Sequence, residues 1–158
     1  MRTAGVTHGL DFNITRSCNV YGPRQKKENL VPHVLHGLIE QRPIRIHGTG
    51  ENFRQYIYVD DAINGIATVL AHGRPGETYN IGGDDVLSNL EMVDTLAKQL
   101  GRKPLVTHIQ DRKAHDFGYR VDSSKLRGLG WKPRVTLADG IERTAEHYMR
   151  HSGQAYAA

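Results

Sequence analysis

Cysteine and long hydrophobic segments are the features that this sequence lacks most clearly. Its 158 residues contain one cysteine, Cys18, which excludes a disulfide within the chain and is typical of a reducing compartment such as the cytoplasm. No apolar run approaches the length needed to span a membrane, and the N-terminus shows no apolar segment of the signal-peptide kind. We therefore expect a cytoplasmic protein with no membrane partner.

Clustered charge is also scarce. The chain carries 21 lysines and arginines against 17 acidic residues, which gives a formal net charge of +4. The cations are scattered from Arg2 to Arg150, and the only dense group is Arg-Gln-Lys-Lys at 24–27. No zinc-finger or basic-zipper spacing occurs. This pattern argues against a nucleic-acid partner and favours a small anionic ligand.

Metal-ligand and nucleophile patterns are weak. His147 and His151 are four residues apart on a predicted helix, but the glutamate of the zinc-protease motif is missing between them. His33 and His36 have no acidic third ligand. Cys18 is better interpreted as a small core thiol than as a nucleophile. We expect no metal site.

Hydrophobic periodicity predicts short strands that alternate with helices. A length of 158 residues suits one domain with a substantial core. The alternation, without repeats or low-complexity linkers, favours an α/β or α+β layer fold. The predicted strands are 12–16, 43–47, 53–59, 78–81 and 105–109, with a loop at 19–23, and the predicted helices are 30–39, 60–70, 88–100 and 136–148.

Particular side chains mark the helix ends. Ser88 and Glu91 have the spacing of a capping box, and Gly101 ends the helix that they begin. Asp60 is predicted to cap the N-terminus of the helix at 60–70, and Thr136 is predicted to cap the last helix of the chain.

The strand at 53–59 holds the most informative residue, Arg54. Side chains alternate along a strand, so one face is mostly apolar and the other places Arg54 among tyrosines. A guanidinium in this setting can hold a phosphate through forked hydrogen bonds, or it can simply pair with a carboxylate. Two polar segments, 16–23 and 111–116, are candidate binding loops or else an ordinary turn and a solvated charged loop.

Six short motifs lie between about residue 9 and residue 150. They are 15–23 (TRSCNVYGP), 28–32 (ENLVP), 48–60 (GTGENFRQYIYVD), 77–83 (ETYNIGG), 111–122 (DRKAHDFGYRVD) and 129–133 (LGWKP). Together they resemble the C-terminal part of extended short-chain dehydrogenase/reductase enzymes that act on nucleotide sugars, the NAD-dependent epimerase/dehydratase family. The block at 111–116 favours the dTDP-glucose 4,6-dehydratase branch, lyases of deoxysugar biosynthesis.

The resemblance implies the C-terminal portion of a Rossmann-type α/β fold. Residues 1–25 would be the trailing helix, strand and loop of the cofactor domain. Residues 26–152 would bind the nucleotide sugar as a small mixed α/β lobe, with 61–83 packed back on the Rossmann sheet. Residues 153–158 would form a flexible tail.

The resemblance also implies a substrate site, residue by residue. Two guanidiniums on separate segments suit a diphosphate. The implied roles are pyrophosphate contact for Asn19, a place along the substrate for Asn29 and Leu30, a border of the base for Arg45, Ile46 and His47, a phosphate clamp for Arg54 and Arg112, and completion of the pocket for Asn89 and His115.

Departures from the family pattern concern the cofactor above all. Val20 stands where the family has an asparagine associated with NAD, and Asn29 replaces a lysine. The dinucleotide-binding G-x-x-G-x-x-G and the catalytic Tyr-x-x-x-Lys occur nowhere in the sequence. We expect the chain to start just after the second motif, to have no catalytic residue of its own, and not to bind NAD alone. Whether it acts as an enzyme by itself stays open.

The leading hypothesis is the nucleotide-sugar-binding part of a dTDP-glucose 4,6-dehydratase-like enzyme. Family members oxidise C4 of the sugar with NAD, eliminate water across C5–C6 and return the hydride at C6. An N-terminal Rossmann half is the expected partner, and the intact family is expected to form homo-oligomers. The alternatives are a fragment of another nucleotide-sugar epimerase or dehydratase, a non-catalytic nucleotide-sugar-binding subunit, and a nucleic-acid-binding module.

Overall fold

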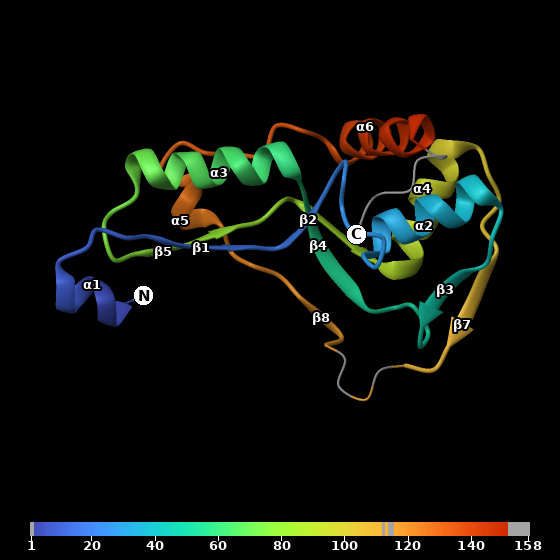
Figure 1. Ribbon diagram of the computed structural model, residues 1–158, viewed down its shortest axis with the longest axis horizontal. Coiled ribbons are helices and arrows are strands. Elements are labelled where there is room, and N and C mark those ends of the chain that lie inside the picture. Colours follow the sequence, from blue (N-terminus) through green and yellow to red (C-terminus); the bar gives the residue numbers. More distant parts are fainter. Residues whose placement is uncertain (1, 112, 114–115, 152–158) are drawn as a thin grey trace.

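The computed structural model describes residues 2–111, 113 and 116–151, which form short, mostly parallel strands covered by helices (Figure 1). The mixed α/β class predicted from the sequence is confirmed. The helices are α1 (Arg2–His8), α2 (Leu30–Glu40), α3 (Val59–His72), α4 (Asn89–Leu100), α5 (Ser124–Arg127) and α6 (Leu137–Arg150). The strands are β1 (Ile14–Ser17), β2 (Asn19–Tyr21), β3 (Ile44–His47), β4 (Phe53–Tyr58), β5 (Thr78–Ile81), β6 (Asp85–Ser88), β7 (Val106–Ile109) and β8 (Gly118–Tyr119).

Within the described residues the strands pair in three small sheets. β1 lies parallel to β5, and β3 lies parallel to β7. The central sheet is built on β4, which pairs in parallel with β2 and β8 and antiparallel with β6. In this register Asn19 is opposite Tyr56, and Arg54 is opposite Tyr119. Three strands from distant parts of the sequence, β2, β6 and β8, therefore pair with β4.

Two hydrophobic cores flank the central sheet. One lies among α2, α4 and α6 and includes Tyr21, Tyr56 and Tyr58. The other lies under α3 and α5, against β1 and β5, and includes Trp131 and Cys18. Figure 1 shows these two helix groups on opposite sides of β4. Burial raises the pKa of the Cys18 thiol, which supports its interpretation as a core residue.

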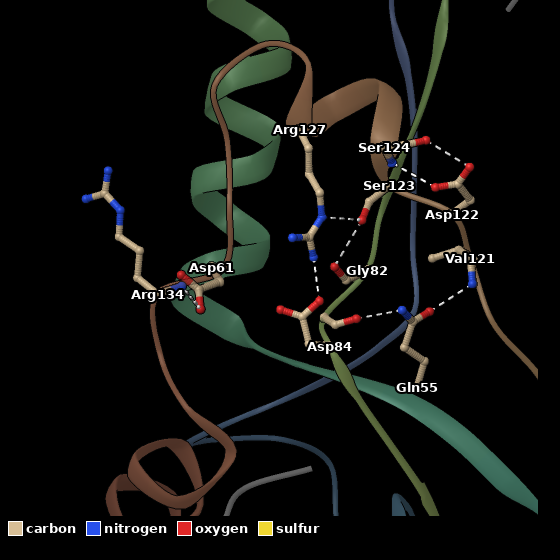
Figure 2. A network of polar contacts seen from close by, with 11 residues as sticks. Gln55, Asp61, Gly82, Asp84, Val121, Asp122, Ser123, Ser124, Arg127 and Arg134 are labelled. Atoms are coloured by element: carbon tan, nitrogen blue, oxygen red, sulfur yellow. Dashed lines mark hydrogen bonds and ion pairs between the residues drawn. The ribbon is translucent and has the colours of Figure 1, made fainter.

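A network of polar contacts ties β4 and α3 to the C-terminal third of the chain (Figure 2). The buried Gln55 donates from Nε2 to the carbonyl of Gly83 at 2.6 Å and accepts at Oε1 from the Val121 amide at 2.8 Å. Asp61, which is 1% exposed, accepts at Oδ2 from the backbone amides of Arg134 and Val135 at 3.0 and 2.8 Å. The Gln55 contacts fix β4, from which Arg54 projects, and the Asp61 contacts fix the first turn of α3.

Most predicted helix ends are confirmed. Ser88 and Glu91 form the capping box, Thr136 caps α6, and Gly101 ends α4 in the left-handed region, with φ of 59°. Asp60 was wrong as a cap, because α3 begins at Val59 and Asp60 lies in its first turn. No helix in the described part of the chain is long and apolar enough to cross a membrane.

Other differences from the sequence expectations have clear physical causes. The predicted loop at 19–23 begins with β2, because its backbone pairs with β4 and its Tyr21 side chain enters the larger core. The tyrosine face of β4 is also a core face, since Tyr56 and Tyr58 are buried there. β6, β8 and α5 were not predicted.

The capping box of α4 yields a direct test of this local structure. Replacing Ser88 by alanine removes the acceptor for the Glu91 amide, which lies 3.1 Å from Ser88 Oγ. We expect a loss of about 1 kcal/mol in the free energy of unfolding, measured by urea denaturation. Ser88→Asp retains an acceptor and should lose less than half as much; equal losses in both variants would contradict the capping role.

Candidate functional site

A cavity of about 330 Å³ opens where β2, β3, β4 and the first residues of α2 and α4 converge. Side chains that the sequence predicts to bind substrate line much of it. Seven of those residues face this cavity: Asn19, Leu30, Arg45, Ile46, His47, Arg54 and Asn89. The remaining lining residues are Glu28, His33, Tyr56 and Ile109.

Arg54 is held by backbone carbonyls. Its Nη1 donates to the carbonyl of Phe53 at 2.7 Å and to that of Phe117 at 3.4 Å, and its Nη2 donates to the carbonyl of Asp116 at 3.1 Å. Carbonyls orient the guanidinium without neutralising its charge. No ion pair between described residues includes Arg54, so the alternative of a simple pair with a carboxylate finds no support there.

Asn19 and Arg54 are linked through Tyr119 of β8. The Tyr119 hydroxyl donates to Asn19 Oδ1 at 2.5 Å, and the Arg54 guanidinium carbon lies 5.3 Å from the centre of the Tyr119 ring. The Asn19 carboxamide nitrogen is thereby the group left to donate toward a ligand. A cation over the tyrosine face adds a favourable contact that restricts the guanidinium.

Two helix N-termini contribute to the same cavity. Asn89 is the first residue of α4, and Leu30 is the first residue of α2. The Asn89 amide donates to the carbonyl of Asn52 at 3.0 Å, which fixes the start of α4 beside β4. The positive ends of two helix dipoles together with Arg45 and Arg54 favour an anion, against the single carboxylate of Glu28.

Burial also fixes the protonation state of a phenol in the cavity. Desolvation raises the pKa of Tyr56 to about 12, with the Arg54 cation opposing and Tyr119 adding to this shift. Tyr56 is therefore a neutral hydroxyl near pH 7 that can donate a hydrogen bond. It lies on the same strand as Arg54, two residues away.

A histidine of α2 forms a hydrogen bond to the backbone of β3, the strand that forms one edge of the cavity. The Arg45 amide donates to His33 Nε2 at 3.2 Å, and His47 Nδ1 lies 3.0 Å from the carbonyl of Gln110. The first of these bonds requires an unprotonated Nε2 on His33. Burial lowers the pKa of His33 below its usual 6.5, and the positive charge of Arg45 lowers it further.

This histidine predicts a pH dependence of stability. Because the pKa of folded His33 is lowered, its contribution to stability is complete above about pH 6.5 and is lost as the pH falls through the lowered value. His36 and His147 have lowered pKa values as well. The loss of stability that the wild type shows at low pH is therefore the sum of contributions from several histidines.

The variant His33→Gln isolates the contribution of His33 to this pH dependence. The glutamine amide oxygen can accept the hydrogen bond from the Arg45 amide and does not titrate in this range. We expect urea denaturation from about pH 7.5 to about pH 5 to show a smaller loss of stability in His33→Gln than in the wild type. Parallel curves for the two proteins would contradict the role of His33.

Four predicted positions lie apart from the main cavity or outside the described residues. Asn29 and Val20 line a neighbouring hollow of about 240 Å³, which shares Asn19, Leu30 and Tyr56 with the main cavity. Arg112 and His115 lie outside the described residues.

Sequence reasoning missed several residues of the site. Tyr119 belongs to a motif in the sequence, but its pairing with Asn19 and Arg54 depends on β8, a two-residue strand with no periodic signal. His33 stood out only as a weak metal candidate, because its hydrogen bond to β3 spans two elements. Glu28 lies within the quoted motif at 28–32, where a resemblance to the family gave it no role.

A family model identifies the class of protein to which this fold and cavity belong. Residues 1–82 match the NAD dependent epimerase/dehydratase family. This match takes in more than half of the chain, and the chain therefore belongs to that family.

Among individual proteins, strong similarities are to dTDP-glucose 4,6-dehydratases. The enzyme from Streptomyces griseus is 43% identical over 148 residues, which are 92% of this chain and 45% of that protein. The structure of DesIV, the dTDP-glucose 4,6-dehydratase from Streptomyces venezuelae with NAD and TYD bound, matches with a TM-score of 0.93 and 41% identity, over 98% of this chain and 49% of that one.

A more distant likeness is to a UDP-glucose 4-epimerase from Thermotoga maritima, solved with UDP-glucose. Its TM-score is 0.87 at 27% identity, over 94% of this chain and 49% of that one. The chain thus spans about half the length of the relatives it matches. The predicted resemblance to Rossmann-type extended dehydrogenase/reductase enzymes is confirmed.

No described strand passes through a glycine-rich turn of the dinucleotide-binding kind into a helix. A dinucleotide usually binds where a parallel strand leads through a glycine-rich turn into a helix. In the described chain, β1 continues through Cys18 into β2, β5 continues through Gly82 and Gly83 into β6, and β4 passes straight into α3. None of these parallel strands makes that turn into a helix.

Proposed function

We propose that this chain is the nucleotide-sugar-binding part of a dTDP-glucose 4,6-dehydratase-like enzyme. In this proposal the chain holds the substrate, while a cofactor-binding half supplies NAD and the groups that oxidise C4, eliminate water across C5–C6 and reduce C6. The chain alone would bind its ligand without turning it over. Its relatives named dTDP-glucose 4,6-dehydratase, at up to 43% identity, support this choice of branch.

The orientation of Arg54 is the observation that carries the proposal. Its guanidinium is positioned by three backbone carbonyls, and it lines the same cavity as Asn19 and Asn89. An oriented guanidinium that shares a cavity with two carboxamides is suited to a diphosphate, which offers several oxygens to charge-assisted donors. The phenol of Tyr56 and the N-terminus of α4 add neutral and dipolar donors to the same cavity.

The remaining walls suit the other parts of a nucleotide sugar. Arg45, Ile46 and His47 form the β3 edge of the cavity and would border the nucleoside, as the resemblance implies. Leu30 would lie along the bound molecule. The volume of about 330 Å³ falls in the usual range for small-molecule sites.

Two surfaces support docking of a cofactor-binding half. On α3, Ile63, Ile66 and Leu70 are 58%, 49% and 84% exposed and follow one another at helical spacing. In the described chain β1 pairs with β5 alone, so β1 and β5 each have a further edge that could take another strand. A Rossmann half that extends this parallel sheet would cover both features, and homo-oligomers would form from the completed units.

Calorimetric titration of the chain with dTDP, UDP and a short DNA duplex tests the binding proposal. We expect saturable binding of dTDP, weaker binding of UDP, and no specific binding of the duplex. Binding of the duplex alone, with a steep dependence on salt, would instead support a nucleic-acid-binding module.

A UDP-sugar epimerase is the second candidate, favoured by the likeness to the Thermotoga maritima enzyme. Mixing the chain with an N-terminal cofactor-binding half and NAD separates the alternatives. Formation of a 4-keto-6-deoxy sugar from dTDP-glucose supports the dehydratase. Epimerisation of UDP-glucose supports the second candidate, and binding without turnover in either mixture supports a non-catalytic subunit.

A further inference from the structure

A second cavity, of about 460 Å³, adjoins the candidate site and shares two lining residues with it. His33 and Arg45 line both cavities. The residues that line the second one are Lys27, His33, His36, Gly37, Arg42, Pro43 and Arg45. We call it the basic cavity.

Positive charge dominates the basic cavity. Lys27 precedes α2, Arg42 follows it, and Arg45 lies on β3, so three separate segments each supply one cation. Among the described residues that line this cavity there is no carboxylate. The nearby Glu40 forms an ion pair with Arg42, and its Oε1 lies 3.5 Å from His36 Nδ1. One carboxylate against three cations leaves a positive field in the hollow.

Two imidazoles in the wall respond to that field. Burial lowers the pKa of His36, and the charges of Lys27 and Arg42 lower it further. His36 also packs edge-on against the ring of Tyr148, with 5.4 Å between ring centres. Both His33 and His36 are thus neutral near pH 7 and can take part in hydrogen bonds without adding charge. An anion bound in the cavity would counter the positive field and so raise the pKa of His36.

We propose that the basic cavity is a second anion site, which takes the phosphate group of a phosphorylated small molecule. Two guanidiniums and an ammonium around one hollow favour phosphate, because arginine binds its oxygens in pairs and lysine adds a point charge. The volume leaves room for an organic group attached to the phosphate. This site is distinct from the proposed diphosphate site at Arg54, although His33 and Arg45 line both cavities.

Histidine proton NMR with inorganic phosphate and glucose 1-phosphate tests this proposal. In the Arg54→Ala chain, where the first cavity lacks its guanidinium, either probe should shift the His36 ring resonances in a saturable way and raise the pKa of His36. Tighter binding of glucose 1-phosphate would identify an organic phosphate as the ligand, and equal binding would identify free phosphate. No His36 response would overturn the proposal.

Variants in which a neutral side chain replaces a cation test where the phosphate binds. Lys27→Met combined with Arg42→Gln changes two exposed side chains and should weaken phosphate binding about tenfold. The control pair Arg74→Gln and Lys132→Met removes two exposed cations elsewhere and should leave binding unchanged. Equal weakening in both doubles would mean that phosphate senses only net charge, which contradicts a built site.

The first double variant must still bind dTDP like the wild type. Loss of dTDP binding in that variant would show that the two cavities form one binding site, which would also contradict the proposal. Absence of dTDP binding in the wild type, with the phosphate response intact, would instead defeat the proposed function alone.

Discussion

Arg54→Ala is expected to weaken dTDP binding by about 100-fold, with little change in the fold of the chain. Two charge-assisted hydrogen bonds to phosphate oxygens contribute about 3 kcal/mol together, which corresponds to that ratio of dissociation constants. In the structure the guanidinium is oriented by the carbonyls of Phe53, Asp116 and Phe117 rather than neutralised by an acid. Calorimetric titration with dTDP measures the effect directly.

Two control variants show that the effect belongs to this guanidinium. Arg54→Lys keeps a positive charge but loses the fork, so its affinity should lie between those of the wild type and the alanine variant. Arg74→Ala removes an exposed cation in the loop between α3 and β5 and should bind like the wild type. Equal affinities for Arg54→Ala and Arg74→Ala would show that Arg54 makes no direct contact with the ligand.

The largest expected loss of stability comes from Asp61→Ala. The Asp61 carboxylate is buried and accepts two backbone amides, those of Arg134 and Val135, while the Asp61 carbonyl accepts from Trp131 Nε1 at 3.2 Å. Without the carboxylate both amides lose their acceptor in a buried region. We expect the free energy of unfolding to fall by about 2–4 kcal/mol, measured by urea denaturation.

Asp61→Asn separates hydrogen bonding from charge. Both amides donate to the same oxygen, Oδ2, so the carboxamide oxygen of asparagine can accept both. This variant should lose less than half as much stability as the alanine variant. A loss below about 0.5 kcal/mol in Asp61→Ala would contradict the structural role of these two bonds.

Local signals in the sequence were sufficient for the helix ends that depend on neighbouring residues. Ser88 with Glu91 forms its capping box within one turn, and Gly101 ends the same helix by adopting a left-handed backbone. These features involve residues close together in the chain, which a pattern can reveal. Asp60 failed as a predicted cap because Val59 already has helical geometry at the end of β4.

Non-local pairing explains most of what the sequence could not reveal. β2 has three residues and is followed by Gly22, so it resembles a turn until β4 lies beside it. Tyr119 reaches Asn19 across 100 positions of sequence. The exposed stripe on α3 has the spacing of a core-facing helix, yet Leu70 is 84% exposed.

The candidate site was found mainly through the family resemblance. Seven implied residues converge on one cavity although they come from five separate elements, a grouping that no spacing in the sequence shows by itself. Arg54 was the one member that alternation along a strand picked out unaided, because a permanent cation beside buried tyrosines is unusual. The second, basic cavity has no sequence motif at all, since its cations come from either side of α2 and from β3.

A crystal structure of this chain grown with dTDP tests the central claim most directly. The account predicts the diphosphate in the cavity of about 330 Å³, with its oxygens within hydrogen-bond distance of the Arg54 guanidinium and the side chains of Asn19 or Asn89. The nucleoside should lie toward β3. A chain that binds dTDP elsewhere, with Arg54 still bonded only to backbone carbonyls, would contradict it.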